Sequence, residues 1–306
     1  MGHAEPGDVG VARPAVNPQG AAGRGVGAYP AATADPVAAG WAALRAFFTD
    51  GVAALERATE AFQAAEPSVR AGGDPARTTL WLLGLATALR YSRRPEPMEA
   101  GLERARELVN LVARTQDETA TIPYRTHVES ILRDLADVVP AQAQGFLTEG
   151  LEYSERTVRL ARKAARDEWL APALASRGDL LQRLAATRDG PTIRRAVVAH
   201  EEARRRWMSR DLYGRAQAAL GYGDALLSPS RRRREPGKAE TVAREALPIF
   251  LNHRDRYHEA SARLLLARAL FALDQSEALD EHAAAIALFH ALGCRWEAAR
   301  AQRALG

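Results

Sequence analysis

A four-residue element of the form Arg-Asp-x-aromatic recurs at a fixed spacing in the second half of the sequence. It occupies Arg166–Trp169, Arg210–Tyr213 and Arg254–Tyr257, so successive copies are 44 residues apart. A weaker copy follows at a spacing of 39 and places Trp296 where Tyr257 stands. Self-similarity at such a period is the signature of a repeat array, in which each unit buries its apolar face against the next.

The recurring element has a simple interpretation as the boundary between two helices. An arginine in the last turn of a helix complements the negative end of the helix dipole. The aspartate that follows caps the next helix by accepting hydrogen bonds from its first backbone N–H groups. Between these boundaries apolar residues recur with the helical period, as in Val128, Ile131, Leu132 and Leu135. The sequence therefore predicts an all-α protein, in which the recurring aromatic residue packs at each helix start.

Helix pairs are expected throughout residues 36–306. We count about six antiparallel pairs, beginning near residues 36, 75, 117, 167, 211 and 255, and a last helix from about Arg295 to Leu305 that caps the exposed end. Pro172 falls in the second turn of one expected helix, so that helix should start late or be kinked. Residues 1–35 are rich in Gly, Pro and Ala without periodicity, and we expect a disordered tail there.

Small residues recur at equivalent places of the expected pairs, as in the tetratricopeptide repeat, which the sequence resembles. They are Gly178, Gly223 and Ala267 on first helices, and Ala196, Ala203, Ala239 and Ala246 on second helices. The period of 44 exceeds the 34 residues usual in that family, and we expect the extra residues between paired helices, in Thr187–Thr192 and Pro229–Gly237.

This long-looped variety resembles the repeat arrays of CHAT-associated caspase-like proteases and of large bacterial transcriptional regulators. The resemblance implies a right-handed α-solenoid over residues 36–306. Neither a protease domain nor a helix-turn-helix domain is visible in the sequence. The activities of those relatives therefore do not carry over to this chain.

Charge and cysteine content narrow the classes of partner and compartment. The net charge is only +4, and lysine is nearly absent, a bias that with the abundant alanine is typical of a high-GC bacterial genome. The basic residues scarcely cluster, which argues against a nucleic-acid partner. The single cysteine fits a reducing cytoplasm. No secretory signal is present, and the most apolar window, Thr78–Leu89, is too short to span a membrane.

No residue pattern matches a metal site or a cofactor site. His253 and His258 are five residues apart, and His282 and His290 are eight apart, whereas two ligands on one helix face need a spacing such as i, i+4. Cys294 takes the place of the recurring aspartate and is interpreted as an unreactive turn residue. We expect no metal, no cofactor and no catalytic residue.

The strongest local charge feature is the run Arg231, Arg232, Arg233 and Arg234, which lies in an expected loop. Arginine suits acidic or phosphorylated partners because its planar fork binds them in a bidentate manner. The run lacks the interleaved aromatic residues of a surface for single-stranded nucleic acid. It is a candidate partner contact, and the alternative is a solvated insertion of biased composition.

Three further candidates for partner binding lie on expected first helices. In a solenoid these helices line a concave groove, which accepts an extended peptide or a partner helix. Gln217, Asp224 and Arg268 are expected to face this groove. The leading hypothesis is therefore a non-catalytic adaptor that binds a protein or peptide there.

The alternative hypothesis is an all-α enzyme or small-ligand receptor with a pocket between helices. The two hypotheses differ in the shape that they require at the centre of the array. A closed cavity lined by several charged groups would favour the pocket, whereas an open, featureless groove would count against it.

Overall fold

A computed structural model describes residues 35–305, apart from residues 186–189, 208–210 and 232–233. These described residues form thirteen α-helices and no strand. The helices are α1 (Pro36–Asp50), α2 (Val52–Gly72), α3 (Pro75–Tyr91), α4 (Pro95–Thr115), α5 (Ile122–Val138), α6 (Ala143–Lys163), α7 (Asp167–Ala185), α8 (Gly190–Trp207), α9 (Leu212–Leu226), α10 (Pro236–Asn252), α11 (Arg256–Phe271), α12 (Ala278–Ala291) and α13 (Arg295–Gln302). Short 3-10 helices, η2 (Glu118–Thr121) and η3 (Pro140–Gln142), precede α5 and α6.

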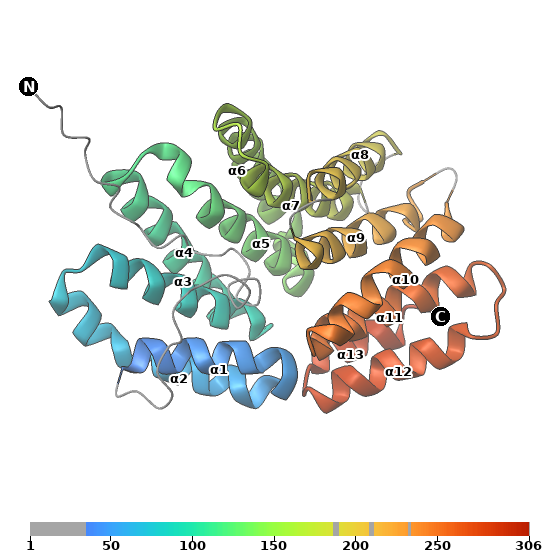
Figure 1. Ribbon diagram of the computed structural model, residues 1–306, viewed down its shortest axis with the longest axis horizontal. Helices are drawn as coiled ribbons and strands as arrows, with labels where there is room; N and C mark the ends of the chain where they lie inside the picture. Colours follow the sequence, from blue (N-terminus) through green and yellow to red (C-terminus); the bar gives the residue numbers. More distant parts are fainter. Residues whose placement is uncertain (1–34, 186–189, 208–210, 232–233, 306) are drawn as a thin grey trace, which may run out of the picture.

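Consecutive helices pack as antiparallel pairs, from α1 with α2 to α11 with α12, and α13 follows alone (Figure 1). This confirms the predicted all-α solenoid of stacked helix pairs with a final capping helix. Five of the six pairs begin within a residue or two of the predicted positions. The pair predicted near residue 117 opens with η2 at Glu118, and its first α-helix, α5, starts at Ile122. The predicted tail, residues 1–35, lies outside the described residues except for Asp35, whose side chain caps α1.

Capping explains why the helix boundaries were visible in the sequence. Asp211 caps α9 and Asp255 caps α11, each accepting a hydrogen bond from the backbone N–H three residues later, at 3.0 and 2.9 Å. Asp167 differs, because it is the first residue of α7 and its carboxylate pairs with Arg206 at 2.6 Å. Arg210, the recurring arginine of the second copy, lies outside the described residues.

The long repeat period comes only partly from loops. Nine residues, 227–235, join α9 to α10 as predicted, but α7 and α8 are joined by residues 186–189 alone. In the first half of the chain the helices themselves are long, and α4 and α6 have 21 residues each. The expected late start of α7 is wrong, because this helix begins at Asp167 and continues through Pro172.

Small residues let the helices approach closely, as the tetratricopeptide resemblance implies. Gly178 of α7 faces the imidazole ring of His200 on α8, and a Cβ at this glycine would lie 2.6 Å from Nε2. Gly223 of α9 faces Leu265 of α11 at a similar distance. The four apolar residues of the predicted stripe on α5 are all fully buried. The core is therefore built between successive helix pairs.

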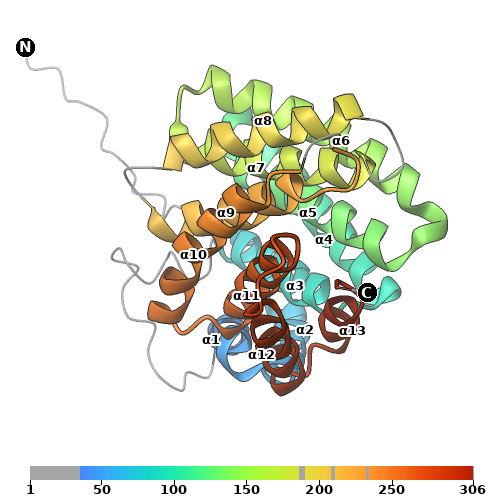
Figure 2. The ribbon, with the colours of Figure 1, turned by 90° about the vertical axis from the view of Figure 1, so that its right-hand side faces the viewer.

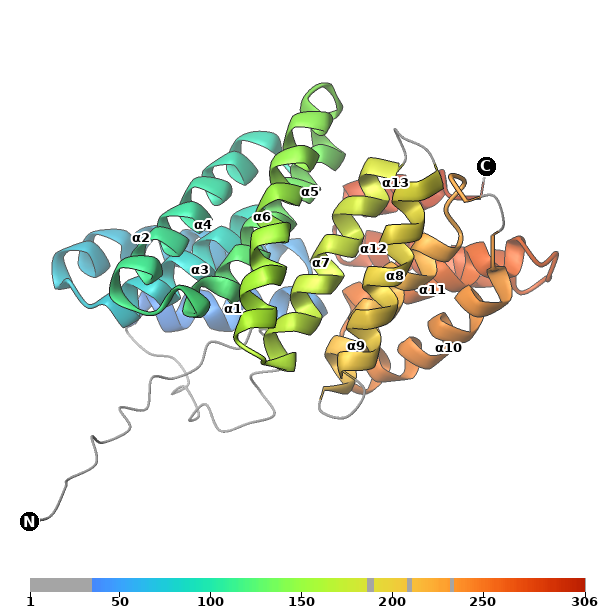
Figure 3. The same ribbon diagram turned by 90° about the horizontal axis from the view of Figure 1, so that it is seen from above.

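The array curves until its two ends meet. Figure 1 shows the first helices beside the last ones, and Figure 2 shows α11–α13 in front of α1–α3. The backbone N–H of Val52 donates to the carbonyl of Leu292 at 2.8 Å, and Arg93 pairs with Glu297 at 2.9 Å. Seen from above in Figure 3, α1–α6 form one side of the molecule and α8–α13 the other. The concave surface of the solenoid thereby becomes the wall of a partly open central cavity.

Candidate functional site

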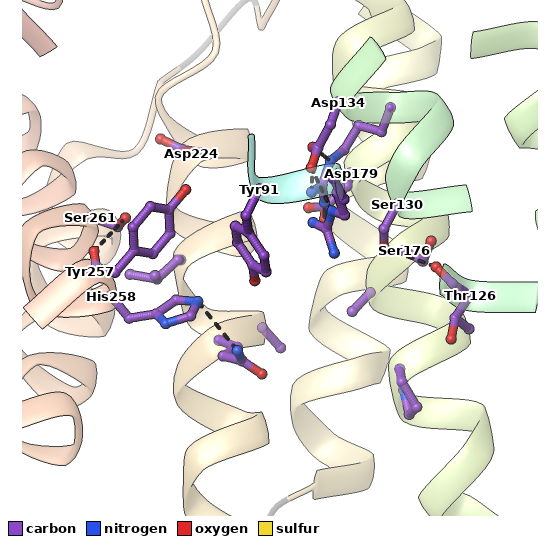
Figure 4. Close-up of a pocket in the computed structure, with 18 of the residues that line it drawn as sticks. Tyr91, Thr126, Ser130, Asp134, Ser176, Asp179, Asp224, Tyr257, His258 and Ser261 are labelled. Carbon is purple, nitrogen blue, oxygen red and sulfur yellow. Dashed lines mark hydrogen bonds and ion pairs between the residues drawn. The ribbon is translucent and has the colours of Figure 1, made fainter. Parts of the chain in front are cut away.

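The first helix of each pair faces the centre of the closed array. Because these helices run in the same direction, equivalent residues of successive pairs lie next to one another. They surround a cavity of about 380 Å³, part of which is drawn in Figure 4. The walls come from the odd-numbered helices and from Arg93, two residues after α3. The second helices add His200, Trp207 and Phe289.

Two rings of equivalent side chains line this cavity. The first, which we call the neutral ring, consists of Leu83, His127, Pro172, Gln217 and Ser261. The second, the charged ring, consists of Arg90, Asp134, Asp179, Asp224 and Arg268. It lies seven residues, or about two helical turns, further along each helix. Neighbours within each ring are 44 or 45 residues apart, so the repeat period itself gathers the charges at one end of the cavity.

Asp134 is the most heavily paired member of the charged ring. It is almost fully buried and lies 2.6 Å from Arg90, 3.0 Å from Arg93 and 2.7 Å from Arg133. Burial alone would raise the pKa of this carboxyl, but the three guanidinium groups outweigh it and hold the pKa well below its ordinary value. Arg133 also pairs with Asp179, so the network runs from α3 across α5 to α7.

Arg93 connects this network to the end of the chain. Its Nε donates to Glu297 on α13 at 2.9 Å, and its Nη2 donates to the hydroxyl of Tyr257 at 3.4 Å. The guanidinium also lies over the ring of Trp296, 5.1 Å from the centroid. The charged end of the cavity is thus completed by the contact between the first and last helix pairs.

A second group of charges comes from α5, α7, α9, α11 and α13. Arg183 donates to Asp137 at 2.9 Å, and Arg268 pairs with Asp224. Burial would raise the pKa of Asp224, but Arg268, Arg300 and Arg183 together hold it below its ordinary value. Asp224 therefore contacts Arg268 and also feels the positive charges of two arginines from two other helices.

The other end of the cavity offers aromatic rings and uncharged hydrogen-bonding groups. His258 is stacked between Phe48 and Phe250, with ring centroids 5.8 and 5.3 Å apart. Its Nδ1 lies 2.6 Å from the Asp255 carboxylate, and its Nε2 lies 3.3 Å from the amide nitrogen of Gln217. With the proton on Nδ1 donated to Asp255, Nε2 accepts from Gln217. Aspartate thereby fixes the orientation of a ring that faces the cavity.

His127 adds a second imidazole to the cavity wall. Burial, helped by the nearby Arg90, lowers the pKa of His127 to about 3. Its Nε2 lies 3.3 Å from the hydroxyl of Thr87. His127 can therefore hydrogen-bond a ligand without adding charge.

The structure places the sequence-predicted residues in two different regions. Gln217, Asp224 and Arg268 all line the central cavity, and Asp224 pairs with Arg268. Of the arginine run, neither Arg231 nor Arg234 lines the cavity. Arg231 pairs with Glu235 of the same loop, Arg234 is exposed, and Arg232 and Arg233 lie outside the described residues.

Most of the charged cavity residues were missed by the sequence analysis. They are Arg90, Arg93, Arg133, Asp134, Asp137, Asp179, Arg183, Glu297 and Arg300. The repeat spacing carried a usable signal for the charged ring, since its members follow one another at 44 or 45 residues. The three central members are all aspartate, but the ring begins and ends with an arginine, Arg90 and Arg268, which hides the full pattern from a search for identical residues.

Cys294 and His282, which the sequence analysis also considered, make contacts that indicate a structural role. Cys294 is buried at the start of α13, and burial raises the pKa of its thiol to about 12, so the reactive thiolate is disfavoured. His282 contacts the carbonyl of Ala301 at 2.8 Å. Within the described ranges, no group of three or more metal-binding side chains occurs, and no helix is long and apolar enough to cross a membrane.

Comparison with known proteins gives a likeness of fold. The sequence matches no protein-family model, and no curated protein matches it significantly. A Signal Transduction ATPase with Numerous Domains (STAND) protein with a tetratricopeptide repeat sensor, from Pyrococcus horikoshii, is 13% identical with a TM-score of 0.49. The match covers 83% of this chain and 37% of that one, so this chain spans little more than a third of the STAND protein.

BtubC (BKLC) from P. vanneervenii is 17% identical with a TM-score of 0.45, over 82% of this chain and 90% of that one. At these identities neither likeness reaches the level at which a shared ligand or partner follows.

Proposed function

We propose that the protein is a binding module that holds a small polar molecule in its central cavity. The observation that carries this proposal is a cavity that forms where the two ends of the array meet and that is lined by the charged ring. Its volume of about 380 Å³ falls within the usual range of small-molecule sites.

The adaptor hypothesis, in which a protein or peptide binds the concave groove, stays a prediction. Closure counts against it, because α1 contacts α11 and Arg93 pairs with Glu297 of α13, so the two ends of such a groove meet. The pocket hypothesis fits this shape more directly.

We infer that the carboxylates of the cavity serve recognition and not general base catalysis. A carboxylate that acts as a general base must be free to take a proton at working pH. The five carboxylates that line the cavity are engaged in ion pairs with arginine. Asp134 and Asp224, whose pKa values are lowered, are especially weak bases. The arrangement suits recognition of a polar ligand.

The proposal is tested by filling the cavity. Ala175 lies on the cavity wall of α7, and Ala175→Trp should block the space with an indole ring. Wild-type protein and variant are purified natively from the host and extracted with methanol, and the released small molecules are compared by mass spectrometry. We expect a compound that accompanies the wild type and is depleted at least tenfold in the variant.

Ala64→Trp is the matched control, because Ala64 is exposed on α2, far from the cavity wall. It should carry the compound as the wild type does, and circular dichroism establishes that both variants are folded. The proposal is wrong if no compound accompanies the wild type, or if A175W retains it. A protein partner recovered equally with all three forms would favour an adaptor that uses the outer surface.

A further inference from the structure

The charges at the charged end of the cavity do not balance. Arg90, Arg93 and Arg133 face three acids, Asp134, Asp179 and Glu297, in one connected network. The second group has three arginines, Arg183, Arg268 and Arg300, but only two acids, Asp137 and Asp224. One positive charge is therefore left over, and it belongs to the second group.

Arg300 is the arginine without an acidic partner. Among the described residues no carboxylate lies within ion-pair distance of it, and the contact found is with the ring of Trp296, 5.7 Å from the centroid. Arg300 is one of the residues that line the cavity. Arg183 uses Nε for Asp137, and Arg268 uses Nη1 for Asp224, so both keep further N–H groups without an acceptor in the described part of the chain.

The three guanidinium groups repel one another. Burial and the nearby charges of Arg183 and Arg268 lower the pKa of Arg300, and the attraction of Asp224 only partly offsets them. A guanidinium nevertheless stays protonated in proteins. A half-buried charge that cannot be neutralised by losing its proton is stabilised by an anion from outside the chain.

We propose that Arg300, together with Arg183 and Arg268, binds one oxyanion, a carboxylate or a phosphate group, of the molecule held in the cavity. This rests on the proposed function and names the class of its ligand. The planar fork of arginine matches two oxygens of such a group, which favours bidentate binding. The rest of the ligand faces the uncharged groups and aromatic rings at the other end, such as Gln217 and His258. The ligand is therefore a small molecule with an anionic end and an uncharged remainder.

Asp224 competes with the ligand for the same arginines. It pairs with Arg268, and the positive charges of Arg300 and Arg183 also help to lower its pKa. Removing its charge should release these guanidinium groups and strengthen the binding of an anion. A purely structural role of the arginines predicts no such gain, so this variant separates the two explanations.

The experiment is isothermal titration calorimetry of the purified protein with inorganic phosphate and with succinate, at ionic strength held constant with sodium chloride. Succinamide, the neutral analogue of succinate, is the uncharged probe. We expect wild type to bind at least one of the two anions, and Arg300→Gln to weaken that binding by about tenfold or more, since charged hydrogen bonds contribute on that scale. Asp224→Asn should tighten it. Which anion binds more tightly tells a phosphate from a carboxylate ligand.

Arg303→Gln is the matched control, because Arg303 is exposed one residue beyond α13. It should bind the anion as the wild type does. The proposal is overturned if neither anion binds, if R300Q and R303Q are equally affected, or if D224N does not tighten binding. A neutral compound recovered with the wild type and lost in A175W would also overturn it, while leaving the small-molecule function intact.

Discussion

Glu129 on α5 is fully buried, and its contacts indicate that it carries a proton. The hydroxyl oxygen of Thr157 lies within hydrogen-bond distance of both Glu129 Oε1 and the carbonyl of Tyr153. A hydroxyl has one hydrogen, so it cannot donate to both acceptors. Both contacts are satisfied when the carboxylic acid donates to Thr157 and Thr157 donates to the carbonyl. Burial accordingly raises the pKa of Glu129 to about 8.

Because of this raised pKa, the stability of the fold depends on pH between about 4.5 and 8. The folded chain keeps the proton above the pH at which the unfolded chain releases it, so stability falls as the pH rises from about 4.5 toward 8 and then levels off. At about 1.4 kcal/mol for each unit, the loss is on the order of a few kcal/mol. Glu129→Gln, which resembles the protonated acid, should be more stable than the wild type at pH 9. Urea unfolding at pH 5 and pH 9 measures the difference.

Two further comparisons test whether Glu129 is protonated in the fold. At pH 5 the wild type and E129Q should unfold at similar urea concentrations, because both then carry a neutral side chain. Glu103→Gln, at an exposed position of α4, should follow the pH profile of the wild type. Parallel pH profiles for wild type and E129Q would show that Glu129 is ionised in the fold.

The candidate site could be predicted from the sequence only in part, and the reason lies in individual residues. Gln217, Asp224 and Arg268 were found because their repeats align clearly and because first helices face inward in a solenoid. Asp134 occupies the same repeat position, but the sequence similarity of its repeat is weak. Arg300 enters the cavity through the closure of the array, which no local pattern encodes.

At the scale of single helices, the starts of helices can be predicted from the sequence because the residues that signal them are local. An aspartate followed by proline opens both α1 and α3, where Asp35 and Asp74 each accept a hydrogen bond from the backbone N–H two residues later. Helix length is less visible in the local sequence, since Pro67 lies inside α2 and does not end it. Packing against neighbouring helices stabilises a helix that contains an unfavourable residue such as proline, and the local sequence does not show this packing.

Glycine shows how closely these helices must approach. Gly84 of α3 lies against the ring of Phe62 on α2, and a Cβ there would come within 2.2 Å of Cζ. Phe62 is also held by Gly40 of α1, so its ring has no room to move. Gly84→Ala should destabilise the protein by about 1–3 kcal/mol through overpacking. Chemical denaturation monitored by circular dichroism measures this change.

Gly145 of α6 provides the opposite case, because a Cβ there would meet nothing within 4 Å. Gly145→Ala should therefore stabilise the protein by about 0.5–1 kcal/mol, the ordinary gain from replacing glycine in a helix. Opposite signs for the same substitution would establish that the approach at Phe62 is essential. Equal effects at the two sites would contradict the packing described for α1, α2 and α3.

For the whole molecule, the decisive feature is closure, and it rests on contacts between residues far apart in the chain. Gly51 has a φ of +80°, and a Cβ there would lie 2.1 Å from the carbonyl oxygen of Leu292, so only glycine fits this junction. Arg93 and Glu297 are 204 residues apart. Repeat patterns describe each pair and its neighbour, which is why they predicted a solenoid without showing that its ends meet.

Arg93 should hold the ends together. Its guanidinium joins Asp134 to Glu297, and its side chain is only 12% exposed. Breaking a buried ion pair from one side costs about 3–5 kcal/mol, because the remaining charge loses its partner. Arg93→Met keeps an aliphatic chain of similar length but removes the charge, so Glu297 is left with Tyr257 alone. We expect lower stability and a larger radius of gyration in small-angle X-ray scattering, with helical content preserved.

Faster hydrogen exchange in α11 and α13 of this variant would locate the opening at the junction. Arg77→Ala is the control, because Arg77 and Asp35 form an exposed ion pair within the first two helix pairs, where less than about 1 kcal/mol is expected. It should leave the scattering curve unchanged. Superimposable curves for R93M and wild type would mean that packing between α1 and α11 closes the ring without Arg93. An expanded R93M that also loses the bound small molecule would tie the closure directly to the binding function.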